Sequence, residues 1–131
     1  MTEQQQNRKP DEQQHKEEKI LDPKTVTKVS GKYIVGTYKI WDKKAKRNVT
    51  YNFRFPGYEK ATGFLELVRS GDLRALYGAL MKGDEDLDLP KVIQNPDIDG
   101  IQKLDWEYWE GHSKMLPVMN AAAQFLVEQL D

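Results

Sequence analysis

The chain has 131 residues, of which 38% are hydrophobic and 31% are charged, which is enough for one domain and too few for two. It contains no cysteine, which excludes disulfide bonds, thiolate zinc sites and thiol nucleophiles and fits a reducing compartment. Its formal net charge of −1 creates no overall field that would attract nucleic acid or an anionic membrane. No stretch reaches the roughly 18 consecutive apolar residues of a membrane span, and residues 1–19 lack the apolar run of a secretory signal. We therefore expect a cytoplasmic protein without membrane association.

Residues 1–24 differ from the rest of the chain in composition. They carry mixed charges and five glutamines, and they hold almost nothing apolar before Ile20 and Leu21. Such a segment cannot bury enough surface to offset the entropy of ordering it. We expect a disordered tail over 1–24, of which 11–21 can form a helix on a partner, and a single α+β domain over 25–131.

The domain is predicted to begin with a β-hairpin over residues 32–55. Val49, Tyr51, Phe53 and Phe55 alternate with polar residues, which is the period of a half-buried strand. The segment 33–41 is rich in β-branched and aromatic residues and is the natural partner strand.

After the hairpin, the apolar residues follow the spacing that is typical of helices. Glycines and aspartates at cap positions bound two helices, over 58–70 and 72–82. Shorter helices are predicted over 89–95 and 105–111, and an apolar final helix over 117–130. The expected fold is α+β but mostly helical: an N-terminal β-hairpin followed by about four to five α-helices and preceded by a disordered tail.

The sequence offers little for catalysis. Its two histidines are His15 in the tail and His112, which we interpret as a surface or linker residue. The acidic run 84–88 does not fit a calcium-binding EF-hand, because Leu89 and Asn95 stand where the loop needs glycine and glutamate. Paired acids at 97 and 99 leave a metal site open without positive support. We predict a non-enzyme with no cofactor and no metal.

Two charged segments are candidate electrostatic contacts. The acidic loop contributes Asp84, Glu85 and Asp86, and the tip of the hairpin contributes Lys43, Lys44, Lys46 and Arg47. The tip can touch phosphates, but the adjoining aromatic residues Tyr51 and Phe53 lie on the predicted buried face. Nucleic-acid binding through the tip is therefore the weaker interpretation, and protection of the hairpin against edge pairing is the stronger one.

Apolar residues near the C-terminus are candidates for a protein interface. Two tryptophans lie one turn apart, two methionines can adapt to different partners, and the final helix has a wide apolar stripe. The candidates are Trp106, Trp109, Met115, Met119, Ala122, Phe125, Leu126 and Leu130. Core packing is the alternative for the tryptophans, and the sequence does not separate core from interface.

Four short pieces of sequence resemble the tail assembly chaperones of long-tailed bacteriophages, particularly those of Gram-positive hosts. They are YNFRFPG (51–57) running into the helix YEKATGFLELV, then KVIQNP (91–96), LDWEYW (104–109), and the closing apolar helix AAAQFLVEQL (121–130). The likeness spans some 80 residues from Val49 onward. The glutamine-rich tail departs from the pattern and leaves open a related phage or mobile-element protein.

The resemblance implies a non-catalytic helper in the host cytoplasm that coats the tape-measure protein, keeps its apolar helices soluble and helps recruit tail-tube subunits. It also implies a homo-oligomer and a longer frameshifted product. Two alternatives remain: a phage regulatory adaptor that binds one host protein, and a weak nucleic-acid-binding protein.

Overall fold

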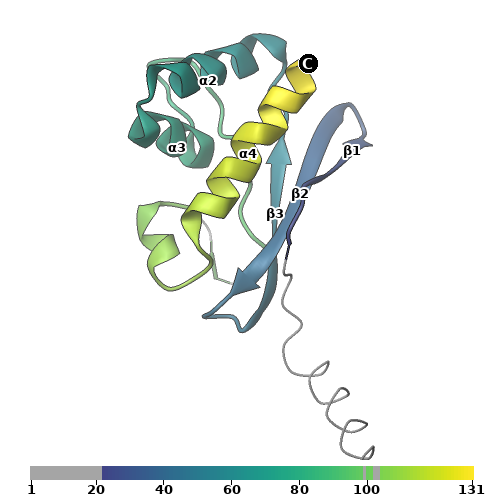
Figure 1. Cartoon of the computed structure of the whole chain (residues 1–131), viewed down its shortest axis with the longest axis vertical. Coiled ribbons are helices and arrows are strands. Elements are labelled where there is room, and N and C mark those ends of the chain that lie inside the picture. The colour runs from purple at the N-terminus through teal and green to yellow at the C-terminus, as the bar shows by residue number, and fades with distance from the viewer. Residues whose placement is uncertain (1–21, 99, 102–103) are drawn as a thin grey trace, which may run out of the picture.

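The computed structural model describes residues 22–98, 100–101 and 104–131 (Figure 1). Strands β1 (Val26–Ser30), β2 (Tyr33–Asp42) and β3 (Arg47–Arg54) form an antiparallel sheet in the order β1-β2-β3. Helices α2 (Tyr58–Ser70) and α3 (Leu73–Lys82) follow, then a 3-10 helix (Trp106–Glu110) and α4 (Met115–Leu130). The helices lie on one side of the sheet, with α4 running along β2 (Figure 1).

The two faces of the sheet differ because strand side chains alternate. Tyr38, Val49, Tyr51 and Phe53 point to the helices and are buried. Phe53 contacts Phe125 of α4, with ring centroids 5.9 Å apart. The opposite face meets none of the labelled helices, so the protein has one core between sheet and helices.

The two edges of the sheet differ in their backbone pairing. A short extended segment pairs with β3: the Arg54 N–H donates to the Val92 carbonyl at 3.0 Å, and the Gln94 N–H donates to the Asn52 carbonyl at 2.8 Å. Strand β1 forms the other edge, and all five of its residues are exposed.

Helix α2 ends and helix α3 begins at the expected cap residues. Gly71 takes a left-handed conformation (φ 77°) after α2, which a residue without a Cβ adopts at little cost. The Asp72 side chain accepts a hydrogen bond from the Ala75 N–H and starts α3. These elements match the helices predicted over 58–70 and 72–82.

The predicted architecture, mostly helical with four to five helices after a hairpin, is wrong. The described residues form a three-stranded sheet and three α-helices. Residues 89–95 are extended, because the N–H groups of Val92 and Ile93 donate to the Leu80 carbonyl and the segment pairs with β3. The segment 105–111 forms only the five-residue 3-10 helix. The expected tail lies outside the described residues except for its last three.

Two further boundaries differ from prediction. β1 was not expected, because its sequence VTKVS has no buried face to give it an apolar pattern. Helix α4 begins at Met115 and places Pro117 at its third position, where the missing N–H costs no helical bond. In the part of the chain that the structure describes, no helix has both the length and the apolar character of a membrane span.

Candidate functional site

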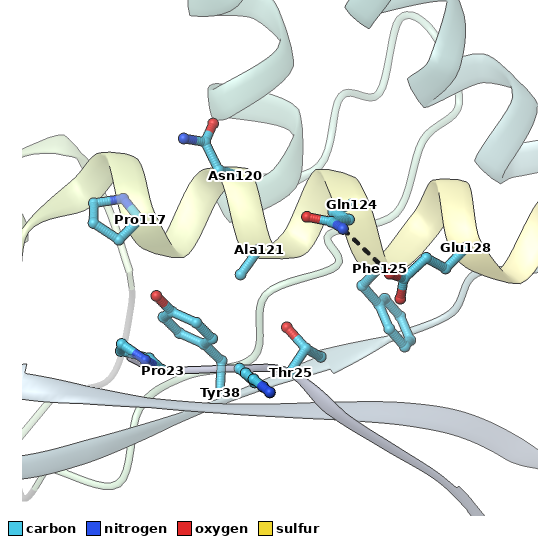
Figure 2. A pocket seen from close by; sticks show the side chains of 10 residues that line it. Pro23, Thr25, Tyr38, Pro117, Asn120, Ala121, Gln124, Phe125 and Glu128 are labelled. Carbon is cyan, nitrogen blue, oxygen red and sulfur yellow. Dashed lines mark hydrogen bonds between the residues drawn. The ribbon is translucent and has the colours of Figure 1, made fainter. Parts of the chain in front are cut away.

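A groove of about 460 Å³ runs between α4 and the sheet, beside the start of β1 (Figure 2). One wall is a single face of α4. The other wall is formed by β2 and by residues 23–25, which lead into β1. The lining residues are Pro23, Lys24, Thr25, Tyr38, Pro117, Asn120, Ala121, Gln124, Phe125 and Glu128.

The floor of the groove is formed by tightly packed side chains that expose little apolar surface. Tyr38 of β2 reaches up toward α4, and Ala121 points down from α4 into the space between Pro117 and Gln124 (Figure 2). Phe125 closes the floor and is fully buried. It fits there because Gly36 has no side chain: a Cβ at this position would lie 2.7 Å from Phe125 Cδ1.

The rim of the groove is polar and mostly uncharged. Gln124 Nε2 donates to Glu128 Oε2 at 3.3 Å, and Asn120 lies one turn before Gln124 (Figure 2). Burial, and then the charge of Asp22, raise the pKa of Tyr38 above its usual value. The groove therefore offers mainly polar side chains, with limited apolar surface at Pro117 and Ala121.

A second apolar surface lies on the other flank of α4, against α2. Val68 and Val127 are 39% and 43% exposed, and Leu130 is half-buried beside them. Only a shallow depression separates the two helices here. Helix α4 therefore has partly exposed apolar residues on both sides of its buried stripe.

The candidate interface residues divide between core and surface. Trp109, Met119, Ala122, Phe125 and Leu126 are buried in the core. Trp109 stacks on Tyr51 with ring centroids 5.6 Å apart, and its Nε1–H donates to Met81 Sδ at 3.2 Å. Three of the candidates reach solvent: Trp106, which is 37% exposed, and the half-buried Met115 and Leu130. The sequence missed the groove side of α4, where Ala121 and Gln124 lie.

Buried polar groups join the hairpin to the start of α4. The Asp42 carboxylate is fully buried, and its Oδ2 accepts from His112 Nδ1 at 3.0 Å and from Ser113 Oγ at 3.4 Å. Its Oδ1 accepts from the backbone N–H groups of Lys44 and Ala45 at 2.9 and 2.7 Å. The interpretation of His112 as a surface or linker residue is wrong, because this carboxylate, 70 positions away in sequence, gives it a buried partner.

This network is not a nucleophile with its base. Ser113 and His112 both donate to the same oxygen of Asp42, whereas a nucleophilic serine would donate to the histidine. Tyr51 extends the network by contacting the Tyr108 hydroxyl at 2.6 Å and by donating to Ser113 Oγ at 3.2 Å. Every one of these groups has a partner inside the fold, which is the arrangement of a structural network.

The two charged candidate segments lie in different parts of the molecule. At the hairpin tip, Arg47 donates to the Asp97 carbonyl at 2.7 Å, while Lys43, Lys44 and Lys46 are exposed. In the acidic loop, Asp84 Oδ1 accepts from the Leu87 N–H, while Glu85 and Asp86 are exposed. Asp88 ties this loop to α2 through an ion pair with Lys60. Among the residues that the structure describes, no group of three or more potential metal ligands comes together.

Comparisons of this chain with protein families, with curated proteins and with solved structures find no match.

Proposed function

We propose that this protein is a non-catalytic assembly chaperone of the phage-tail type, which binds apolar helical segments of a tape-measure protein in the groove between α4 and the sheet. In this proposal it acts in the cytoplasm of the host, coats its cargo in many copies, and helps recruit tail-tube subunits.

The groove carries the proposal. The half-buried Pro117 and Ala121 offer apolar contacts to the cargo, and the surrounding polar side chains can hydrogen-bond its exposed polar groups without demanding one sequence. A chaperone that coats a long filament needs such a site at moderate affinity, since repetition along the cargo supplies the overall strength.

The second apolar flank adds to this support. Val68, Val127 and Leu130 lie on the side of α4 away from the groove, so one copy has two surfaces along the same helix. Two surfaces allow a copy to hold cargo with one and a neighbouring subunit with the other. The sequence likeness to tail assembly chaperones, which includes the α4 segment 121–130, points to the same role.

The test is co-expression of the full chain with the tape-measure protein of the same phage or prophage. We expect the chain to raise the soluble fraction of the tape-measure protein and to co-purify with it. Ala121→Arg fills the centre of the groove with a long charged side chain and should reduce co-purification by at least ten-fold.

Leu116→Arg is the matched control, because Leu116 is 51% exposed on the same helix and lines neither the groove nor the α2–α4 flank. Circular dichroism and thermal unfolding check that both variants fold. A wild-type chain that leaves the tape-measure protein insoluble would refute the function. Equal losses in the two variants would refute the groove as the site.

A further inference from the structure

Among the residues that the structure describes, no helix covers the sheet face turned away from α4, which we call the open face. By the register of the strands, this face carries Lys28, Tyr33, Thr37, Lys39, Asn52 and Arg54. Lys28, Lys39 and Arg54 are exposed, and Tyr33 is 40% exposed. This face and the groove lie on opposite sides of the sheet.

Charge is sharply divided between the sheet and the helices. Residues 24–54 contain nine lysines and arginines against one acid, Asp42, which is fully buried on the helix side. Residues 55–131 contain seven lysines and arginines against fourteen acids. The net charge of −1 therefore averages over a basic segment that forms the sheet and an acidic segment that forms the helices, and three of the nine cations, Lys28, Lys39 and Arg54, stand on the open face.

Aromatic and hydrogen-bonding groups lie among these cations. The Arg54 guanidinium sits over the Tyr33 ring at 4.5 Å, and Lys32 Nζ lies 5.7 Å from the same ring. Thr37 Oγ1 donates to Asn52 Oδ1 at 3.1 Å in the middle of the face. Trp41, half-buried, follows on the same face of β2, about 27 Å from Tyr33 along the strand.

We propose that this open face binds single-stranded nucleic acid, with phosphates at Lys28, Lys39 and Arg54 and with a base taking the place of the Arg54 guanidinium on the Tyr33 ring. Lys28 and Arg54 flank Val35 in one cross-strand row, and Lys39 stands two rows further along β2, about 14 Å away, so a single strand of a few nucleotides can span all three cations. An acidic peptide would satisfy the cations but has no planar group for the Tyr33 ring. A duplex would keep its bases stacked inside and out of reach of that ring.

The binding test uses the full-length protein and fluorescent single strands of about 20 nucleotides, as RNA and as DNA, followed by anisotropy. We expect affinity to fall steeply between about 50 mM and 200 mM salt. The variant Lys28→Glu/Lys39→Glu/Arg54→Glu should weaken binding at least ten-fold and reduce the slope of log K against log salt by about 2, at roughly 0.7 per lost phosphate contact.

The matched control reverses three exposed cations of the helices, Arg69→Glu/Arg74→Glu/Lys82→Glu, and changes the net charge by the same amount. It should bind like the wild type. Tyr33→Ala should weaken binding about five-fold at constant salt slope, because it removes stacking and no charge. If the triple variant does not fold, Lys39→Glu alone takes its place in the test.

Three results would overturn the proposal. One is the absence of binding by the wild type at about 50 mM salt, where phosphate contacts are strongest. Another is equal weakening by the sheet and helix reversals, which would show a response to net charge alone. The third is displacement of the oligonucleotide by poly-glutamate at equal charge concentration with no effect of Tyr33→Ala, which would assign the face to an acidic protein. None of these results depends on the chaperone proposal, whose test uses the other face.

Discussion

Gly36 is the residue on which the floor of the groove depends. It lies in the middle of β2, where glycine normally weakens a strand because it has no side chain to pack. Here the missing side chain makes room for Phe125, and a Cβ would also lie 3.0 Å from Thr25 Cγ2. Since Phe125 is fully buried against Phe53, its ring has little freedom to move aside.

We expect Gly36→Ala to lower the free energy of unfolding by about 1–3 kcal/mol, as overpacking of a buried site does. Urea unfolding followed by tryptophan fluorescence measures the change. Gly78→Ala is the control, because its added Cβ meets nothing closer than 3.7 Å and it lies inside α3. That change should raise the free energy of unfolding by roughly 0.5–1 kcal/mol. Similar effects of the two substitutions would contradict this account of the floor.

Tyr51 and Tyr108 give stability a dependence on alkaline pH. Burial is the main cause that raises the pKa of Tyr51 from 10.0 to about 12, and burial with the Tyr51 hydrogen bond raises the pKa of Tyr108 further. Between pH 10 and 12 the unfolded chain loses protons that the folded chain retains, so the free energy of unfolding falls as pH rises through this window.

Absorbance of tyrosinate near 295 nm should therefore show some of the six tyrosines ionising only above pH 10, as the protein unfolds. Tyr51→Phe should remove part of this late ionisation. Titration of all six together near pH 10 in the folded protein would contradict the prediction.

At the scale of the elements, Asp42 ties the hairpin to the start of α4. One carboxylate oxygen holds the turn after β2, and the other holds His112 and Ser113 just before α4. The groove wall formed by α4 is thereby fixed relative to the sheet. Backbone hydrogen bonds between Val92–Gln94 and β3 also hold the edge of the sheet that β3 forms.

We expect Asp42→Asn to destabilise the protein by about 1–3 kcal/mol, because it replaces a charged acceptor of buried hydrogen bonds with an amide. Asp88→Asn makes the same chemical change at an exposed ion pair with Lys60 and should cost less than about 1 kcal/mol. Urea unfolding of both variants at neutral pH measures these changes in the free energy of unfolding. Equal costs would show that the buried network does not hold the elements together.

For the whole molecule, the main feature is that the two sides of the sheet present different surfaces. The helix side carries the groove, and the open side carries cations and aromatic rings. A small net charge is therefore a poor guide to this protein's partners, because it averages over two segments of opposite sign.

We expect the full-length chain to self-associate, as the coating role requires. Light scattering coupled to size exclusion, over a range of concentrations, should give at least twice the monomer mass, increasing with concentration if the assembly is open-ended. A concentration-independent monomer would contradict the prediction and favour the adaptor alternative. Val127→Arg should then lower the mass if the α2–α4 flank is the contact between copies.

The sequence by itself determined the elements whose signals are local. Alternation of Val49, Tyr51 and Phe53 predicted β3, and glycine and aspartate at cap positions predicted α2 and α3. These features depend on neighbours a few residues away, which a periodic pattern records. The wide apolar stripe of α4 was also visible, although only the structure shows that its centre is core and its flanks are surface.

The tertiary structure alone decided the features built from distant residues. The short pairing of Val92–Gln94 with β3 replaced a predicted helix, because backbone groups on this edge of β3 bond to it. The Asp42 to His112 contact, the fit of Phe125 over Gly36, and the open basic face all join segments far apart in the chain. No local pattern records such partners, since burial and pairing arise only when the sheet and the helices pack together.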